Sequence, residues 1–269
     1  EISRHGVHTA RVNDVGIDAT GTRIVSCGDD GKVVVYSAPG KGSAAANGSG
    51  GREGEQQLDP SRIGGGGAWS AKGDASSQVT SYGRPMLSAA LDPAIVGKRE
   101  RVLISGCVDG RLRVNNRGWF RSSDTILHEG EGPVHLVRWE GSLVAWANDY
   151  GIKLYDNVNH QRISYIERPR PRMESTRAFD VRACRCRMFW EVPEKILLVG
   201  WGDCWMVVQI STRTVTANPT PGASFVESQD IQAQVRCAEI IALHYTQDYV
   251  ISGICAFGED IALLAYVPP

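Results

Sequence analysis

The chain has 269 residues, of which 42% are apolar, enough to bury a substantial core. Lys and Arg number 29 against 30 Asp and Glu, and this net charge of −1 excludes an overall field for holding a nucleic acid. No window approaches the roughly 18 consecutive apolar residues of a transmembrane helix, and 30 Gly favour a turn-rich β protein.

Short strands separated by tight turns recur along the chain in units of three. Five such units follow one another, at residues 12–36, 87–114, 134–156, 187–210 and 240–266. In the first three units a carboxylate precedes the third strand: Asp30, Asp109 and Asp149. Short acidic side chains in such turns hydrogen-bond the turn backbone, so we assign these three residues a structural role.

Self-similar units of this kind are typical of a WD-repeat β-propeller. Without the interruption at residues 40–83, the chain suffices for about five units of roughly 40 to 45 residues, whereas WD-repeat rings commonly close with about seven. We therefore predict an all-β chain, a partial WD-repeat β-propeller over residues 1–269 with about five blades visible.

Residues 40–83 interrupt this pattern after the first unit. They include twelve Gly and a scatter of Ser, with few branched or aromatic side chains. Such a segment cannot bury enough surface to offset the entropy of ordering it. We predict a flexible, low-complexity insertion and give its aromatic residues, Trp69 and Tyr82, no role in a site.

No motif for catalysis, nucleotide binding or metal binding is complete. Residues 96–99 lack the first Gly and the hydroxyl residue of a phosphate-binding loop. Cys184 and Cys186 share one face of a strand, with no second ligand pair at zinc-finger spacing. The seven Cys lie mostly in apolar runs, which indicates core thiols in a reducing compartment. We expect no catalytic residue, no metal and no cofactor.

One candidate contact region surrounds the connection between the second and third units. His128 and Glu129 lie in a loop that joins the outer strand of one blade to the inner strand of the next. Shortly before it stand Trp119, Phe120 and Arg121, residue types that anchor protein interfaces. These aromatic side chains could instead fill the groove between blades, and both interpretations stay open.

A second candidate is the segment 162–187, which holds eight Arg and only three acidic residues. Pro residues alternate with Arg168, Arg170 and Arg172 and keep this part extended, and Arg177 follows. The pattern predicts a loop between blades that contacts an acidic protein or an anionic membrane surface. The alternative is a solvated loop without a partner.

Several short sequence stretches within the units resemble a known family. The resemblance rests on LHEGEG at 127–132, LVAWAN at 143–148 and GIKLYD at 151–156, with further matches at 26–32, 197–202 and 249–253. These stretches closely resemble the N-terminal propeller of the vacuolar protein sorting-associated protein 41 family, and we expect a fungal form.

The resemblance implies a non-catalytic subunit of the HOPS tethering complex, acting in vacuolar protein sorting and in fusion of late endosomes with the vacuole or lysosome. It implies a cytoplasmic protein, peripheral on those membranes. Implied partners are other HOPS subunits, the late-endosomal or vacuolar Rab GTPase and the adaptor complex of the direct vacuolar route. Two other classes stay open: a peptide-binding WD-repeat adaptor of another complex, and a propeller enzyme with acidic residues around a central ion.

Overall fold

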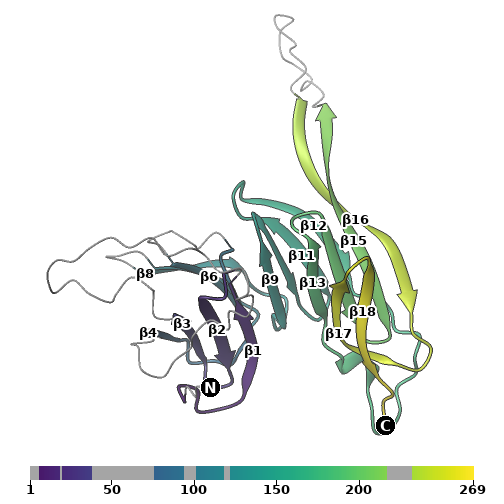
Figure 1. The fold of residues 1–269 in the computed structure, drawn as a ribbon, viewed down its shortest axis with the longest axis horizontal. Coiled ribbons are helices and arrows are strands. Elements are labelled where there is room, and N and C mark those ends of the chain that lie inside the picture. The colour runs from purple at the N-terminus through teal and green to yellow at the C-terminus, as the bar shows by residue number, and fades with distance from the viewer. Residues whose placement is uncertain (1–5, 19, 38–75, 94–100, 118–121, 217–231) are drawn as a thin grey trace, which may run out of the picture.

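The structure is a computed structural model that describes residues 6–18, 20–37, 76–93, 101–117, 122–216 and 232–269. The described chain is almost entirely antiparallel β-sheet (Figure 1). Strands that follow one another in sequence also pair, giving four sheets of four strands and one of two. The first sheet comprises β1 (Val12–Ile17), β2 (Arg23–Gly28), β3 (Lys32–Ser37) and β4 (Ser76–Ser81).

The other sheets repeat this order along the chain. The second comprises β5 (Met86–Leu91), β6 (Arg101–Cys107), β7 (Leu112–Arg117) and β8 (Ser122–His128). The third comprises β9 (Leu136–Glu140), β10 (Leu143–Ala147), β11 (Gly151–Asp156) and β12 (Gln161–Glu167). The fourth comprises β13 (Arg187–Val192), β14 (Ile196–Trp201), β15 (Cys204–Thr216) and β16 (Gln232–Tyr245), and the last comprises β17 (Val250–Phe257) and β18 (Asp260–Tyr266).

The sheets stack face to face, each through its first strand. The strands β1, β5, β9, β13 and β17 contact one another in this order. One apolar core lies between the first and second sheets, a second between the second and third, and a third between the third and fourth. All five residues of β10 are buried because its sheet is covered on both faces. This is the blade arrangement of a β-propeller, and the predicted all-β fold is confirmed.

The prediction for the fifth unit is wrong in its first strand. Residues 240–245 belong to β16, the outer strand of the fourth sheet, and pair with β15. Ile240 and Ile241 are 46% and 54% exposed, so their apolar character does not mark an inner strand. A run of apolar residues predicts a strand but does not tell which sheet it joins. Only β17 and β18 remain in the last unit.

The predicted insertion at 40–83 extends too far toward the C-terminus. Ser76–Ser81 forms β4, which pairs with β3 along its whole length. Tyr82, expected to have no role, packs against the core between the first two sheets. An outer strand needs little apolar surface, and the polar composition of β4 therefore hid it from sequence reasoning. Residues 38–75, with Trp69, lie outside the described residues.

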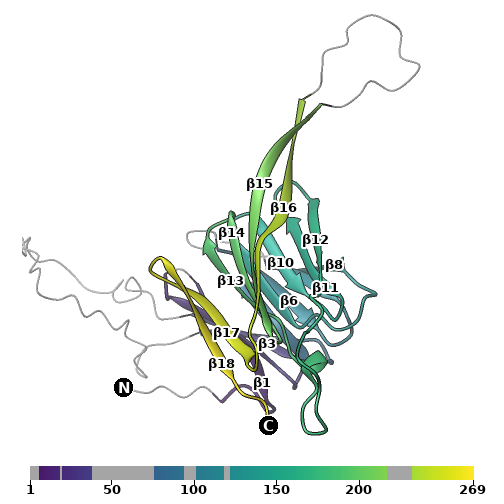
Figure 2. The same cartoon turned by 90° about the vertical axis from the view of Figure 1, so that its right-hand side faces the viewer.

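The hairpin of β15 and β16 is the longest element and projects as an arm from the stacked sheets (Figures 1 and 2). At the base of the arm, Arg236 reaches across to the third sheet. Its guanidinium donates to Ser142 Oγ over 2.6 Å and pairs with Asp156 at 3.2 Å. These contacts brace the arm against the turn between β9 and β10.

Candidate binding face

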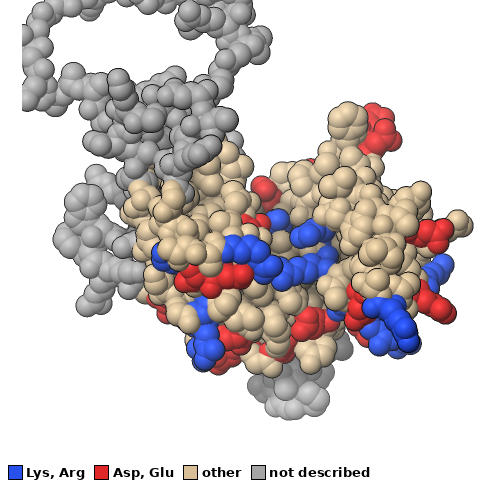
Figure 3. All heavy atoms as spheres, turned by 90° about the horizontal axis from the view of Figure 1, so that it is seen from below, with Lys and Arg blue, Asp and Glu red and all other residues tan. Residues whose placement is uncertain are grey.

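In the four sheets of four strands, the turns between the second and third strands lie at one end of the stack, which we call the lower face. They comprise residues 28–31, 108–111, 148–150 and 202–203. The segment that links β12 to β13 and the end of β18 lie at the same end (Figure 1). Figure 3 shows this face from below, with Lys and Arg interspersed among Asp and Glu. The face carries local charge contrasts rather than a uniform basic field.

Asp30 stabilises the first of these turns. Its carboxylate accepts hydrogen bonds from the backbone N–H groups of Thr9 and Lys32, and it lies 3.0 Å from His8 Nδ1. The other ring nitrogen of His8 lies 2.8 Å from Ser26 Oγ. Burial alone would raise the pKa of Asp30, but these hydrogen bonds outweigh it and lower the pKa to about 2. Asp30 is thus engaged within its own sheet.

Asp109 and Asp149 differ in how they serve their turns. Asp109 Oδ1 accepts from the backbone N–H of Arg111 over 3.1 Å, the expected type of contact. Asp149 instead lies 2.6 Å from His135 Nε2. In that turn the backbone N–H groups of Tyr150 and Gly151 donate to Asn148 Oδ1. The sequence analysis assigned this role to Asp149, whereas Asn148 fills it. Asn and Asp side chains both accept hydrogen bonds in such turns, so the sequence alone does not distinguish them.

The loop candidates around His128 have mainly internal contacts. Burial lowers the pKa of His128, and its ring centroid lies 5.5 Å from that of Trp146. Glu129 pairs with Arg111 at 3.4 Å on the surface. His128, which was expected in a loop, is the last residue of β8 and packs between the second and third sheets. Trp119, Phe120 and Arg121 lie outside the described residues.

Arg168 fixes the start of the Arg-rich segment, which links β12 to β13 as predicted. Its guanidinium carbon lies 4.9 Å from the centre of the Trp201 ring. The same group donates to the backbone carbonyls of Arg182 and Cys184. Arg168 is half-buried and holds two parts of the segment together, so it is a positioning residue rather than a free cation.

Asp203 anchors the middle of the segment, a role that the sequence analysis missed. Its side chain accepts from the backbone N–H groups of Arg172 and Met173, over 2.8 and 2.6 Å. The guanidinium carbon of Arg172 lies 3.9 Å from the centre of the Tyr245 ring. Asp203 occupies the turn before β15, and only its place beside Gly202 in a predicted turn could have pointed to it.

Seven of the eight Arg side chains of the segment are exposed, while the backbone around them is anchored at several points: Arg162, Arg170, Arg172, Arg177, Arg182, Arg185 and Arg187. The carbonyl of Arg170 accepts from the Tyr245 hydroxyl over 3.3 Å. Asp180 caps the short 3-10 turn η1 (Val181–Ala183) by accepting from the backbone N–H of Arg182. The segment thus presents cations from a fixed backbone.

Comparison with known proteins identifies the family of this fold. The family model described as "Vps42 beta-propeller", named for Vps41, matches residues 69–269. The chain belongs to the Vps41 β-propeller family. It is 32% identical to the vacuolar protein sorting-associated protein 41 homolog of Arabidopsis thaliana over 100% of the chain, and 33% identical to that of Solanum lycopersicum. The Vps41 of Schizosaccharomyces pombe is 25% identical over 97% of the chain.

The match covers only part of each Vps41 relative. The chain spans 22% of the Arabidopsis protein and 23% of the tomato and fission yeast proteins. By their names, these relatives are vacuolar protein sorting proteins, and the shared domain is a β-propeller. Within the described residues, no helix is long and apolar enough to cross a membrane. The same residues hold no group of three or more His, Cys, Asp or Glu able to hold a metal ion.

Proposed function

We propose that this chain is a non-catalytic docking module of a HOPS tethering subunit. It acts in vacuolar protein sorting and in the tethering and fusion of late endosomes with the vacuole or lysosome. Its partners are other HOPS subunits, the late-endosomal or vacuolar Rab GTPase and the adaptor complex of the direct vacuolar route, and it works in the cytoplasm, peripherally on these membranes. Membership of the Vps41 propeller family supports the proposal.

The observation that carries the docking role is the anchored Arg-rich segment on the lower face. Arg168 and Asp203 hold its backbone, while Arg170 and Arg177 extend into solvent. A contact surface that is already ordered loses less entropy on binding. Arg guanidinium groups pair with carboxylates or phosphates through two parallel hydrogen bonds. The segment therefore suits an acidic partner surface.

The test replaces exposed cations without disturbing the anchors. Arg170→Gln with Arg177→Gln should reduce pulldown of the other HOPS subunits, or flotation with acidic liposomes, by about tenfold at low salt. The reduction should shrink at moderate salt because ions screen exposed charges. Lys195→Gln with Arg213→Gln is the matched control, since both residues are exposed and lie outside residues 162–187. Equal effects of the two pairs, or none, would refute the contact.

A further inference from the structure

One serine of the Arg-rich segment stands in the sequence context of a protein kinase substrate. Ser175 follows Arg172 by three residues and Arg170 by five, and no other Ser or Thr of the sequence has Arg at both spacings. Kinases that recognise basic segments carry carboxylates in the groove that binds the substrate, and these pair with Arg side chains ahead of the acceptor. The sequence thus holds a single acceptor of this pattern.

The structure presents Ser175 and its two arginines at the surface. Residues 168–180 form no regular helix or strand, and Ser175, both arginines and the two residues after Ser175 are exposed. Arg172 is exposed even though its guanidinium stacks on the ring of Tyr245. The Pro residues that flank Arg170 favour an extended backbone there, which is the form that enters a substrate groove.

The Ser175 hydroxyl is hydrogen-bonded to the residues that follow its turn. It donates to Asp180 Oδ1 over 3.0 Å and accepts from the backbone N–H of Val181 over 3.2 Å. Hydrogen bonds from the backbone N–H of Arg182 and from Ser175 lower the pKa of Asp180, so its carboxylate is charged at neutral pH. The bond to Asp180 is solvent-exposed, and water can replace it when a kinase approaches.

The turn closed by Ser175 links the segment to the last sheet. At its centre, the N–H of Thr176 donates to the carbonyl of Phe179 over 2.8 Å. The ring of Phe179 packs edge to face on that of Tyr266 in β18, with 6.5 Å between the ring centres. A change at Ser175 therefore acts on a contact between two sheets.

We propose that Ser175 accepts a phosphoryl group from a Ser/Thr protein kinase that selects Arg, and that the modification releases this turn from the last sheet. The kinase transfers the γ-phosphoryl group of ATP. A bond forms between Ser175 Oγ and phosphorus, the bond from that phosphorus to the oxygen bridging to the β-phosphate breaks, and ADP leaves. The hydroxyl proton passes to the catalytic base of the kinase.

The modification reverses the local interactions of Ser175. Its ester oxygen can no longer donate to Asp180, and the phosphate, with a charge of about −2 at neutral pH, repels the Asp180 carboxylate. The same charge offsets part of the excess of Arg in the segment. The proposal goes beyond the docking function and does not depend on it, because the kinase reaction needs no HOPS subunit and no membrane.

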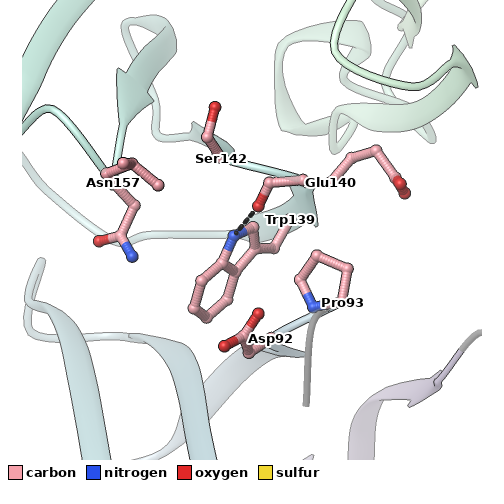
Figure 4. A pocket seen from close by; sticks show the side chains of 8 residues that line it. Asp92, Pro93, Trp139, Glu140, Ser142 and Asn157 are labelled. Atoms are coloured by element: carbon pink, nitrogen blue, oxygen red, sulfur yellow. Dashed lines mark hydrogen bonds between the residues drawn. The ribbon is translucent and has the colours of Figure 1, made fainter. Parts of the chain in front are cut away.

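Ser142 is the contrasting serine of the same chain. It lines the pocket between the second and third sheets that is drawn in Figure 4. Its hydroxyl accepts from the Arg236 guanidinium over 2.6 Å, and its backbone N–H donates to Glu194. The residues three and five positions before it are Trp139 and Val137, neither of them a cation. We expect no phosphorylation of Ser142 by the same kinase.

The test incubates the folded 269-residue chain with ATP and protein kinase B, which selects Arg at these two spacings. Intact mass follows the rate, and tandem mass spectrometry locates the modified residue. We expect one phosphoryl group at Ser175, absent in Ser175→Ala, and a rate at least about tenfold lower in Arg170→Gln with Arg172→Gln. Arg185→Gln, exposed but beyond Ser175 in the chain, is the control and should leave the rate unchanged.

Hydrogen exchange tests the release of the turn. In the phosphorylated chain, the amide protons of Phe179, Val181 and Arg182 should exchange at least about tenfold faster, while those of β14 should not change. No phosphorylation of the folded chain, or modification only of other residues, would overturn the proposal. Equal rates for the parent and the Arg double variant, or unchanged exchange in the turn, would also overturn it.

Discussion

The sheets inside the stack and the sheets at its two ends contain similar strands. Apolar side chains of these strands are buried inside the stack and exposed at its ends. Leu198 of β14 is fully buried, whereas Leu264 of β18 is 68% exposed. At the other end of the stack, Val15 and Ile17 of β1 are 60% and 63% exposed. An alternating strand always creates two faces, and each face is buried only where another sheet covers it. Burial is thus a property of neighbouring sheets rather than of strand composition.

Strand β14 illustrates this dependence, because each of its two faces is buried by a different sheet. Leu197 and Val199 belong to the core shared with the third sheet, so by alternation Leu198 and Gly200 face β17. A Cβ on Gly200 would lie 2.7 Å from Ile251 Cγ2, which shows how closely β17 approaches. Two strands of the last sheet are therefore enough to bury one face of the fourth sheet.

The strongest test of the comparison is a pair of Leu replacements. Leu198→Ala should lower the free energy of unfolding by about 3 kcal/mol, because it removes a fully buried side chain and leaves a cavity. Leu264→Ala should lower it by less than about 0.5 kcal/mol. Urea denaturation of both variants measures the difference. Similar losses would mean that the exposed face of β18 is covered in solution.

The first sheet can be tested at its outer strand. Replacing residues 40–75 with a short Gly-Ser linker should leave the melting temperature unchanged, because loop closure depends only weakly on loop length. Replacing residues 40–83 should lower the melting temperature by several degrees, since β4 and the Tyr82 contact with the core are lost. Thermal unfolding of both variants checks the boundary. A drop with the shorter replacement would assign a packing role to residues 40–75.

A third test acts at the junction of the second and third sheets. In Gly106→Ala the new methyl group would lie 2.5 Å from Val134 Cγ1 and 2.9 Å from the Val134 carbonyl oxygen. Since a carbonyl cannot rotate away, the strands must separate, at a cost of about 1 to 3 kcal/mol. Gly6→Ala is the control, because no atom lies within 4 Å of its added Cβ. Equal stability of the two variants would show that the junction is loose.

The smallest expected effect concerns pH and the polar contacts of Asp30 in the first sheet. Because its pKa is lowered to about 2 in the folded state, Asp30 contributes stability above its ordinary pKa of 3.8. That contribution is lost as pH falls from about 4 to about 2. Asp30→Asn should therefore be less stable than the parent at pH 6, and the difference should shrink at pH 3. A constant difference in urea midpoint would contradict this, and Asp248→Asn on the surface serves as control.

The sequence predicts most strands because their alternation is a local property. The third unit, with β9, β10 and β11, lies where its pattern indicates. Assignment of residues 240–245 to a sheet could not be made, because both an outer and an inner strand fit such a run. The polar strand β4 was missed since it needs no apolar signal.

The candidate site shows the same limit. The excess of Arg between residues 162 and 187 identified the segment, and its charge is a property of composition alone. Which cations are free depends on distant partners. The guanidinium of Arg168 stacks on the ring of Trp201, 33 residues later in the chain. The guanidinium of Arg172 stacks on the ring of Tyr245.

The projecting hairpin of β15 and β16 should show a gradient of amide hydrogen exchange along its length. Near its base, β15 lies between β14 and β16, so its hydrogen-bonding groups face partners on both sides. From Ser211 onward it pairs only with β16, and a ribbon of two strands is marginally stable by itself. Amide protons beyond Ser211 should therefore exchange orders of magnitude faster than those of residues 205–209. One continuous strand would thus contain both slowly and rapidly exchanging amide protons.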